Sequence, residues 1–185
     1  MENWYALRVR SNHENVVQSG LRSRGFEEFL PVYRAKSRWS DRVKVIERPL
    51  FPGYVFARFD PSKRLPVLML PGFVHIVSFG NGPEPVDEKE LHAIRRFVDS
   101  GLPITPWPYL REGEVVVVQR GVLAGLEGIV LRATNSLRLV VSLNLLQRSV
   151  AVELDRESVK PVAARAVVAG TAVQTLKRQA PDRRS

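Results

Sequence analysis

A proline-rich stretch at residues 102–109 divides the sequence into two parts with different patterns. Its sequence, LPITPWPY, has three prolines in eight residues, which is typical of a stiff, extended connection. Before it, segments with strand-like alternation are interleaved with segments of helical spacing. After it, no segment has helical spacing. We therefore expect two domains joined by a linker at residues 102–110.

The first part, residues 1–101, has the element order β-α-β-β-(α)-β-α. This order predicts an α+β sandwich of the ferredoxin-like or RNA-recognition (RRM) type, with an antiparallel sheet. Residues 111–163 contain four short strand-like runs (EVVVVQ, GIVLRA, LRLVVSL and SVAVEL) separated by turn residues. They predict a small SH3-like β-barrel. Residues 164–185 are Ala-rich and finally basic, and we expect a poorly ordered tail.

The segment YVFARF, residues 54–59, is apolar on both faces of the strand that it predicts. A strand with one face in water alternates apolar and polar residues. Here Val55, Ala57 and Phe59 share one face, and Tyr54 and Phe56 share the other. The helices of the sandwich would cover the first face. The second face would either stay open for a partner or be covered by the predicted helix at residues 87–100, and the pattern does not decide between these.

Basic residues are concentrated in two places. The net charge is +9. The predicted hairpin at residues 34–48 carries six basic residues against Asp41 and Glu47, and the tail carries five against Asp182, so each contributes +4. A basic patch can attract nucleic-acid phosphates, although an isolated patch is more often a solvated surface.

Catalytic and metal-binding patterns are absent from the sequence. It contains no cysteine, and its three histidines fall in three different predicted elements without metal-ligand spacing. No nucleophile, phosphate-loop or dinucleotide motif occurs. We expect a protein that is not an enzyme and uses no cofactor and no metal. Without a signal-like or membrane-spanning stretch, we expect it in the cytoplasm.

The segment PGYVFARF, residues 52–59, partly matches the strand motif of RNA-recognition domains, whose aromatic residues stack on bases. Gly53, Tyr54, Phe56 and Phe59 match. Pro52 replaces the basic residue that would contact a phosphate. The match supports the fold and leaves the ligand open.

Three segments, WYALRVRSNHENVV, ERPLFPGYVFARFD and PGFVHIVSFG, resemble the N-terminal (NGN) domain of the NusG family of transcription elongation factors. REGEVVVVQRGVLAGLEGIVLR, residues 111–132, is similar to the family's C-terminal KOW motif. The resemblance covers residues 3–162 in the family's order. PLFPGYVFARFD and LNLL (residues 143–146) are more similar to specialised paralogues of the RfaH type than to the housekeeping factor.

The resemblance implies a factor that binds the clamp helices of bacterial RNA polymerase, suppresses pausing and promotes antitermination. It implies contact with upstream or non-template DNA, and recruitment of a small-subunit ribosomal protein or Rho by the KOW domain. We expect a monomer without membrane contact, and a barrel rather than a helical hairpin in the KOW domain. The alternative is an RNA-binding or ribosome-associated protein with an RRM-like domain.

The resemblance also assigns residues to these surfaces. The polymerase-binding patch would comprise Tyr5, Tyr54, Phe56 and Phe79. The nucleic-acid-facing residues would be Arg10, Arg22, Arg24, Arg34, Lys36, Arg38 and Arg42. Leu123 and Leu126, which flank the KOW turn, would form the partner surface of the barrel.

Overall fold

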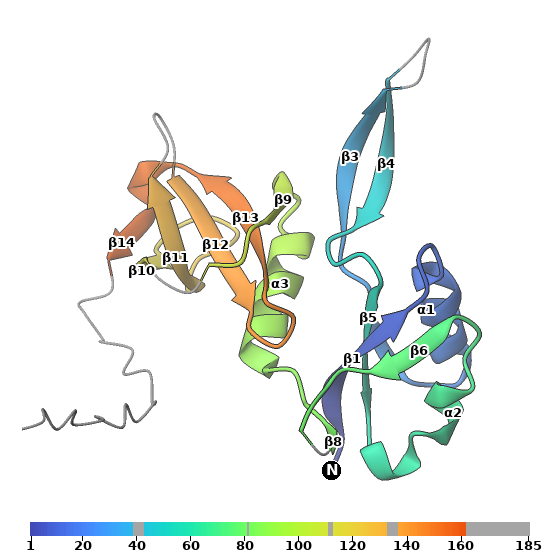
Figure 1. The fold of residues 1–185 in the computed structure, drawn as a ribbon. Helices are drawn as coiled ribbons and strands as arrows, with labels where there is room; N and C mark the ends of the chain where they lie inside the picture. Colours follow the sequence, from blue (N-terminus) through green and yellow to red (C-terminus); the bar gives the residue numbers. More distant parts are fainter. Residues whose placement is uncertain (39–42, 81, 111–112, 133–136, 162–185) are drawn as a thin grey trace, which may run out of the picture.

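The computed structural model describes residues 1–38, 43–80, 82–110, 113–132 and 137–161 (Figure 1). It contains a mixed α+β domain followed by a small β-barrel, as the sequence predicts. In this described part of the chain, no helix is both long and apolar enough to span a membrane.

A four-stranded antiparallel sheet forms the centre of the first domain. Its strands are β2 (Glu27–Phe29), β5 (Tyr54–Phe59), β1 (Asn3–Val9) and β6 (Phe73–Ile76), in that spatial order. Helices α1 (Glu14–Ser23) and α2 (Leu65–Leu68) cover one face, where Val55, Ala57 and Phe59 join one buried cluster. Helix α3 (Glu88–Asp99) packs on the other face.

The helix starts differ in how they are capped. Asp87 caps α3, accepting a hydrogen bond from the amide of Lys89 at 2.7 Å. Helix α1 begins without a side-chain cap. The N-cap is His13, which makes no capping bond, and Asn12 lies in the turn before it at φ 62°. Asparagine tolerates this left-handed conformation better than most residues.

A long two-stranded hairpin, β3 (Val32–Arg38) and β4 (Val43–Pro49), extends away from the central sheet (Figure 1). It confirms the hairpin predicted from the basic segment. A second, short hairpin, β7 (Ser78–Phe79) and β8 (Gly82–Pro83), follows β6.

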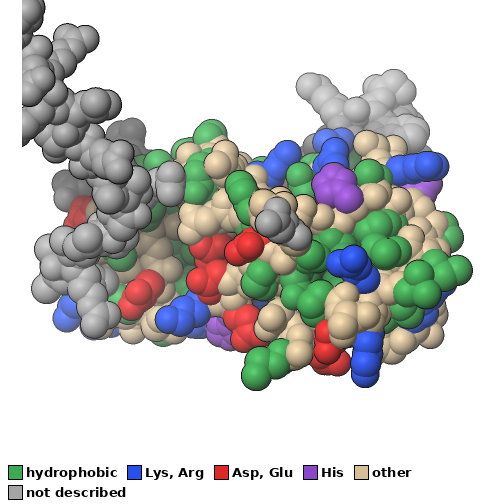
Figure 2. Space-filling model, turned by 60° about the horizontal axis from the view of Figure 1, so that its bottom comes forward, with side chains coloured by type: hydrophobic (Ala, Val, Ile, Leu, Met, Phe, Trp, Pro, Cys, Tyr) green, Lys and Arg blue, Asp and Glu red, His purple; other side chains and the backbone are tan. Residues whose placement is uncertain are grey.

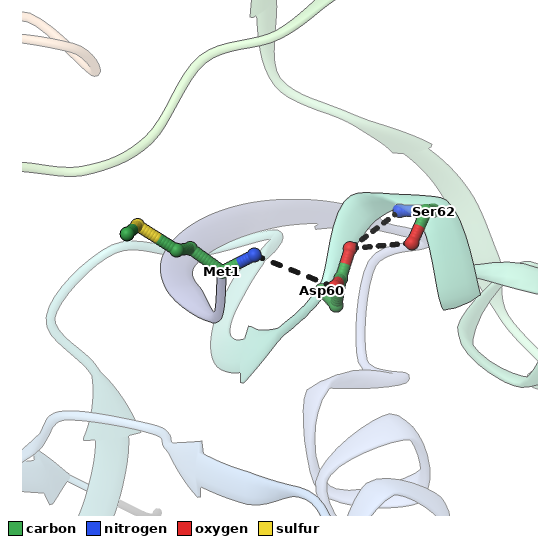
Figure 3. Close-up of polar contacts among 3 residues, drawn as sticks. All are labelled: Met1, Asp60 and Ser62. Carbon is green, nitrogen blue, oxygen red and sulfur yellow. Dashed lines mark hydrogen bonds and ion pairs between the residues drawn. The ribbon is translucent and has the colours of Figure 1, made fainter.

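The turn after β5 is fixed by Asp60. Its carboxylate accepts hydrogen bonds from the amide and the hydroxyl of Ser62, at 2.9 and 2.6 Å, and pairs with the terminal ammonium of Met1 at 3.4 Å (Figure 3). These bonds favour the charged carboxylate. The bonds from Ser62, followed by the charge of the N-terminus, lower the pKa of Asp60 to about 2. Asp60 caps the short 3-10 helix at Pro61–Lys63.

The second domain is a curved sheet in the order β14-β10-β11-β12-β13-β9. Its strands are β9 (Ile104–Trp107), β10 (Glu114–Val118), β11 (Glu127–Arg132), β12 (Leu137–Leu143), β13 (Arg148–Leu154) and β14 (Val159–Pro161). Strand β9 corrects the expectation of a linker, because residues 104–107 pair with β13. The sheet tolerates Pro106 because β9 is an edge strand.

Candidate binding face of the sheet

The sheet face that carries Tyr54 and Phe56 is covered, which is the second of the two alternatives that the pattern of residues 54–59 left open. Phe56 is fully buried, and its ring lies 6.0 Å from that of Phe51 and 6.3 Å from that of Phe29. The buried cluster around it continues from the sheet through α3 into the barrel, and includes Phe97 and Leu143. The doubly apolar strand is therefore explained by core packing on both faces.

The four residues expected to form the polymerase patch do not share one surface. Tyr5 is buried on the opposite face, with its ring 4.8 Å from that of Phe59. Phe79 is 65% exposed, but it lies in β7, which follows the edge strand β6. Because side chains alternate along a strand, Tyr5 cannot point to the same side as Trp4 and Ala6, which join the cluster of Phe56.

Tyr54 is half-buried between two guanidinium groups. The Cζ atom of Arg8, on the neighbouring strand β1, lies 4.9 Å from the ring centroid, and that of Arg148, from the barrel, lies 5.8 Å away. Both are within range of a cation–π interaction. The Arg8 guanidinium also donates long hydrogen bonds of 3.4 Å to the carbonyls of Pro52 and Gly53. The barrel thus reaches the ring that the sequence assigned to a partner.

The barrel is held on the first domain by hydrogen bonds from α3. Glu90 accepts one from the backbone amide of Asn144 at 3.0 Å and a second from the Asn144 side chain. Arg96 donates to the carbonyls of Val122 and Ala124 at 3.1 and 2.9 Å. Burial is the largest influence on Glu90 and raises the pKa of its carboxyl, although the bond from the Asn144 amide opposes this change.

The expected nucleic-acid-facing residues are spread over three elements. Arg10 follows β1, Arg24 follows α1 and Arg34 lies in β3, and all three are exposed. Arg22 is engaged with Glu28, to which its Nε donates at 2.9 Å. The side chains of Lys36 and Arg38 and the whole of Arg42 lie outside the described residues.

The two leucines expected on the barrel surface lie in its core. Leu123 and Leu126 are both buried, whereas their neighbour Val122 is 63% exposed. The turn that carries them folds back, with the amide of Val118 donating to the carbonyl of Leu126 at 2.9 Å, so both side chains point into the barrel. Among the described residues, no group of three acidic or histidine side chains could hold a metal ion.

Contacts made by Arg8, Asn144 and Arg148 were not found from the sequence. The sequence assigned none of them a role, and the contacts of Asn144 and Arg148 depend on how the barrel packs on α3 and β5. The sequence signals near them are the segment WYALRVRSNHENVV, which contains Arg8, and the segment LNLL, residues 143–146, which contains Asn144.

Comparisons with known proteins agree on one family. The family model described as "Transcription termination factor nusG" matches residues 2–95. A Pseudomonas aeruginosa protein named transcription termination/antitermination protein NusG is 29% identical, over 86% of this chain and 98% of its own length. Its namesake from Vibrio vulnificus is 30% identical, over 82% and 91%.

A solved structure has the same fold. The structure entitled "Domain interaction in Thermotoga maritima NusG" aligns with a TM-score of 0.52 at 21% identity, over 88% of this chain and 98% of that one. The likeness supports the α+β domain and the barrel described above.

Proposed function

The chain belongs to the NusG family, and from this premise we propose that it is a transcription elongation factor that binds bacterial RNA polymerase in the cytoplasm. Relatives carry the name of a termination/antitermination protein, which supports a role in suppressing pauses and in antitermination. The segments PLFPGYVFARFD and LNLL favour a specialised factor of the RfaH type.

The polymerase-binding surface that we propose is centred on Tyr54 and lies beneath the barrel. The single observation that carries this proposal is the position of the Tyr54 ring between Arg8 and Arg148. An aromatic ring that is already held in place by Arg8 is a suitable anchor for a protein partner. The barrel has to move aside before the polymerase clamp helices can contact this ring.

The barrel turn is also held against the first domain, by a contact separate from that of Arg148 with Tyr54. Arg96 of α3 binds the carbonyls of Val122 and Ala124, in the turn that precedes β11. We assign the recruitment of a ribosomal protein or Rho to the exposed side chain of Val122 in this turn, in place of the buried leucines. The movement that uncovers Tyr54 would also release the backbone of this turn from Arg96. The basic hairpin, with Arg34, is assigned to upstream or non-template DNA.

Binding of the full chain to core RNA polymerase, without nucleic acid, tests the proposal. Tyr54→Ala should weaken binding about 30-fold, as expected for an aromatic anchor worth about 2 kcal/mol. Arg148→Glu should strengthen binding, because it removes a barrel contact to the ring without changing the first domain.

Val45→Ala is the control, since Val45 is 57% exposed in the hairpin β3–β4 and should leave affinity unchanged. Unchanged polymerase binding in Tyr54→Ala, together with weakened RNA binding, would instead support the RNA-binding alternative.

A further inference from the structure

Strand β6 is an edge strand whose outer side is unpaired within the described part of the chain. It pairs with β1 alone. The amide of Val77 donates to the carbonyl of Ala6, and the carbonyl of Gly72 accepts from the amide of Arg10, so both ends of β6 are held to β1. Hydrogen-bonding positions alternate along an antiparallel strand. The intervening peptide groups therefore face outward, where another extended chain can pair with them.

A groove runs along this outer edge and has a volume of about 480 Å³. We call it the β6 groove. It is lined by Arg64 and Leu68, at the two ends of α2, by β6, and by residues of the hairpin β7–β8. It includes a strand edge, which suits an extended peptide better than a compact ligand.

Exposed apolar side chains surround the β6 groove. Val74 is 51% exposed and lines it together with the exposed Leu68. Leu65, Met69 and Phe79 are exposed in the adjoining elements. Figure 2 shows hydrophobic side chains gathered on the half of the molecule that carries α2 and β6. Exposed apolar patches of this kind mark interaction sites.

The chemistry of β6 permits strand addition but limits its length. Residues Phe73–Ile76 include no lysine, arginine or proline, which are the residues that commonly block pairing at an edge. The strand is only four residues long, and its register with β1 shifts between Arg8 and Val9. A partner can therefore add only a short strand.

The charge of the β6 groove favours an acidic partner. Among the described residues that line it, Arg64 is cationic and none is a carboxylate. Arg64 makes no ion pair with any described residue. The chain's own residues 164–185, which are net basic, and a second copy of the groove would both bring like charges.

We propose that the β6 groove binds a short extended segment of a partner protein, added as a fifth strand to the sheet. Alternate apolar side chains of the segment pack on Leu68 and Val74, and an acidic residue pairs with Arg64. The inference is independent of the polymerase proposal, because the β6 groove lies at the opposite side of β1 from Tyr54.

The test uses the full chain, labelled with ¹⁵N, and the acetylated, amidated heptapeptide Ser-Glu-Val-Thr-Val-Glu-Ser as the probe. We expect saturable amide shifts confined to β6, α2 and the hairpin β7–β8. Val74→Glu should reduce the affinity about tenfold or more by burying a charge at the contact. Arg64→Glu should reduce it about fivefold by reversing the favourable charge.

Two controls make the result specific. Val45→Glu changes a valine of similar exposure, 57%, in the hairpin β3–β4 and should bind the peptide like the parent chain. A peptide with proline in place of its threonine should bind poorly, because proline removes a backbone donor.

Four results would each overturn the proposal. The first is that the peptide causes no saturable amide shifts, and the second is that Val74→Glu leaves the response to the peptide intact. The third is that the chain dimerises with increasing concentration and Val74→Glu abolishes this dimerisation. The fourth is that deletion of residues 164–185 shifts the β6 amides. Loss of polymerase binding in Val74→Glu would assign the groove to the polymerase instead. Polymerase binding by Tyr54→Ala reports on the other proposal alone.

Discussion

Substitution of Gly53 offers a direct test of how the turn before β5 is built. Gly53 has φ +80°, and a Cβ placed there would lie 2.9 Å from Cζ of Arg8, with the guanidinium nitrogens beside it. In Gly53→Ala, Arg8 has to move, and its contact with the Tyr54 ring at 4.9 Å is lost. Gly53 also donates its amide to the buried carboxylate of Glu14 at 2.8 Å, which resists any shift of the backbone.

Three contributions determine the change in the free energy of unfolding of Gly53→Ala. An alanine in the left-handed conformation destabilises the fold by about 1–2 kcal/mol. Alanine also reduces the conformational freedom of the unfolded chain, which offsets about 0.4–1 kcal/mol of this loss. Loss of the contact between Arg8 and the aromatic ring adds about 0.5–1 kcal/mol. We therefore expect Gly53→Ala to lower the free energy of unfolding by about 1.5 kcal/mol, measured by urea denaturation.

Gly25→Ala is the matched control. Gly25 has nearly the same φ, +77°, but a Cβ there would meet nothing within 4 Å. It should lower the free energy of unfolding by only about 1 kcal/mol, since it carries the backbone cost alone. If the two variants agree within about 0.3 kcal/mol, the role assigned to Arg8 is refuted.

Three further predictions concern carboxylates. Glu14→Ala leaves the buried amide of Gly53 without its partner and should lower the free energy of unfolding by about 1–3 kcal/mol, measured by urea denaturation; an unchanged value would contradict this. The lowered pKa of Asp60 means that its contribution to stability is present above pH 3.8 and is lost as the pH falls through about 2. Ser62→Ala should raise this pKa in an NMR titration, and no change would exclude Ser62 as its main cause. The raised pKa of Glu90 means that its carboxyl binds a proton more tightly when the barrel is packed on α3 than when the barrel has moved aside. Falling pH should therefore favour the packed arrangement, in the range above pH 4.5. Fluorescence energy transfer between the hairpin and the barrel would measure this, and Glu90→Gln should abolish the dependence.

Local patterns were sufficient to predict most of the fold. The alternation of strand and helix signals before residue 102, and of strands alone after it, gave the right architecture because these periods report which side of each element is buried. Strand β9 was missed because Pro106 within it, and Pro103 and Pro108 beside it, are typical of a linker, and only its pairing with β13 makes it a strand.

The candidate site was harder to predict because it is formed by long-range packing. The two apolar faces of β5 were recognised, but whether α3 and the barrel cover Phe56 depends on contacts between distant segments. The assignment of Tyr5 failed because its place on the sheet follows from the register with β5, in which it opposes Ala57. Leu123 and Leu126 were placed on the surface because the fold of the turn around them could not be deduced from its glycines.

The inclusion of β9 in the barrel shortens the connection between the domains. Helix α3 ends at Asp99 and β9 begins at Ile104, so four residues, 100–103, join them. An extended chain of this length reaches only about 14 Å, which keeps the barrel at an effective local concentration on the order of millimolar beside α3. The polymerase must then compete with the tethered barrel for the surface around Tyr54, because the barrel cannot diffuse away. A ligand that binds the barrel would remove this intramolecular competitor, and so would act as an activator without contacting the surface around Tyr54.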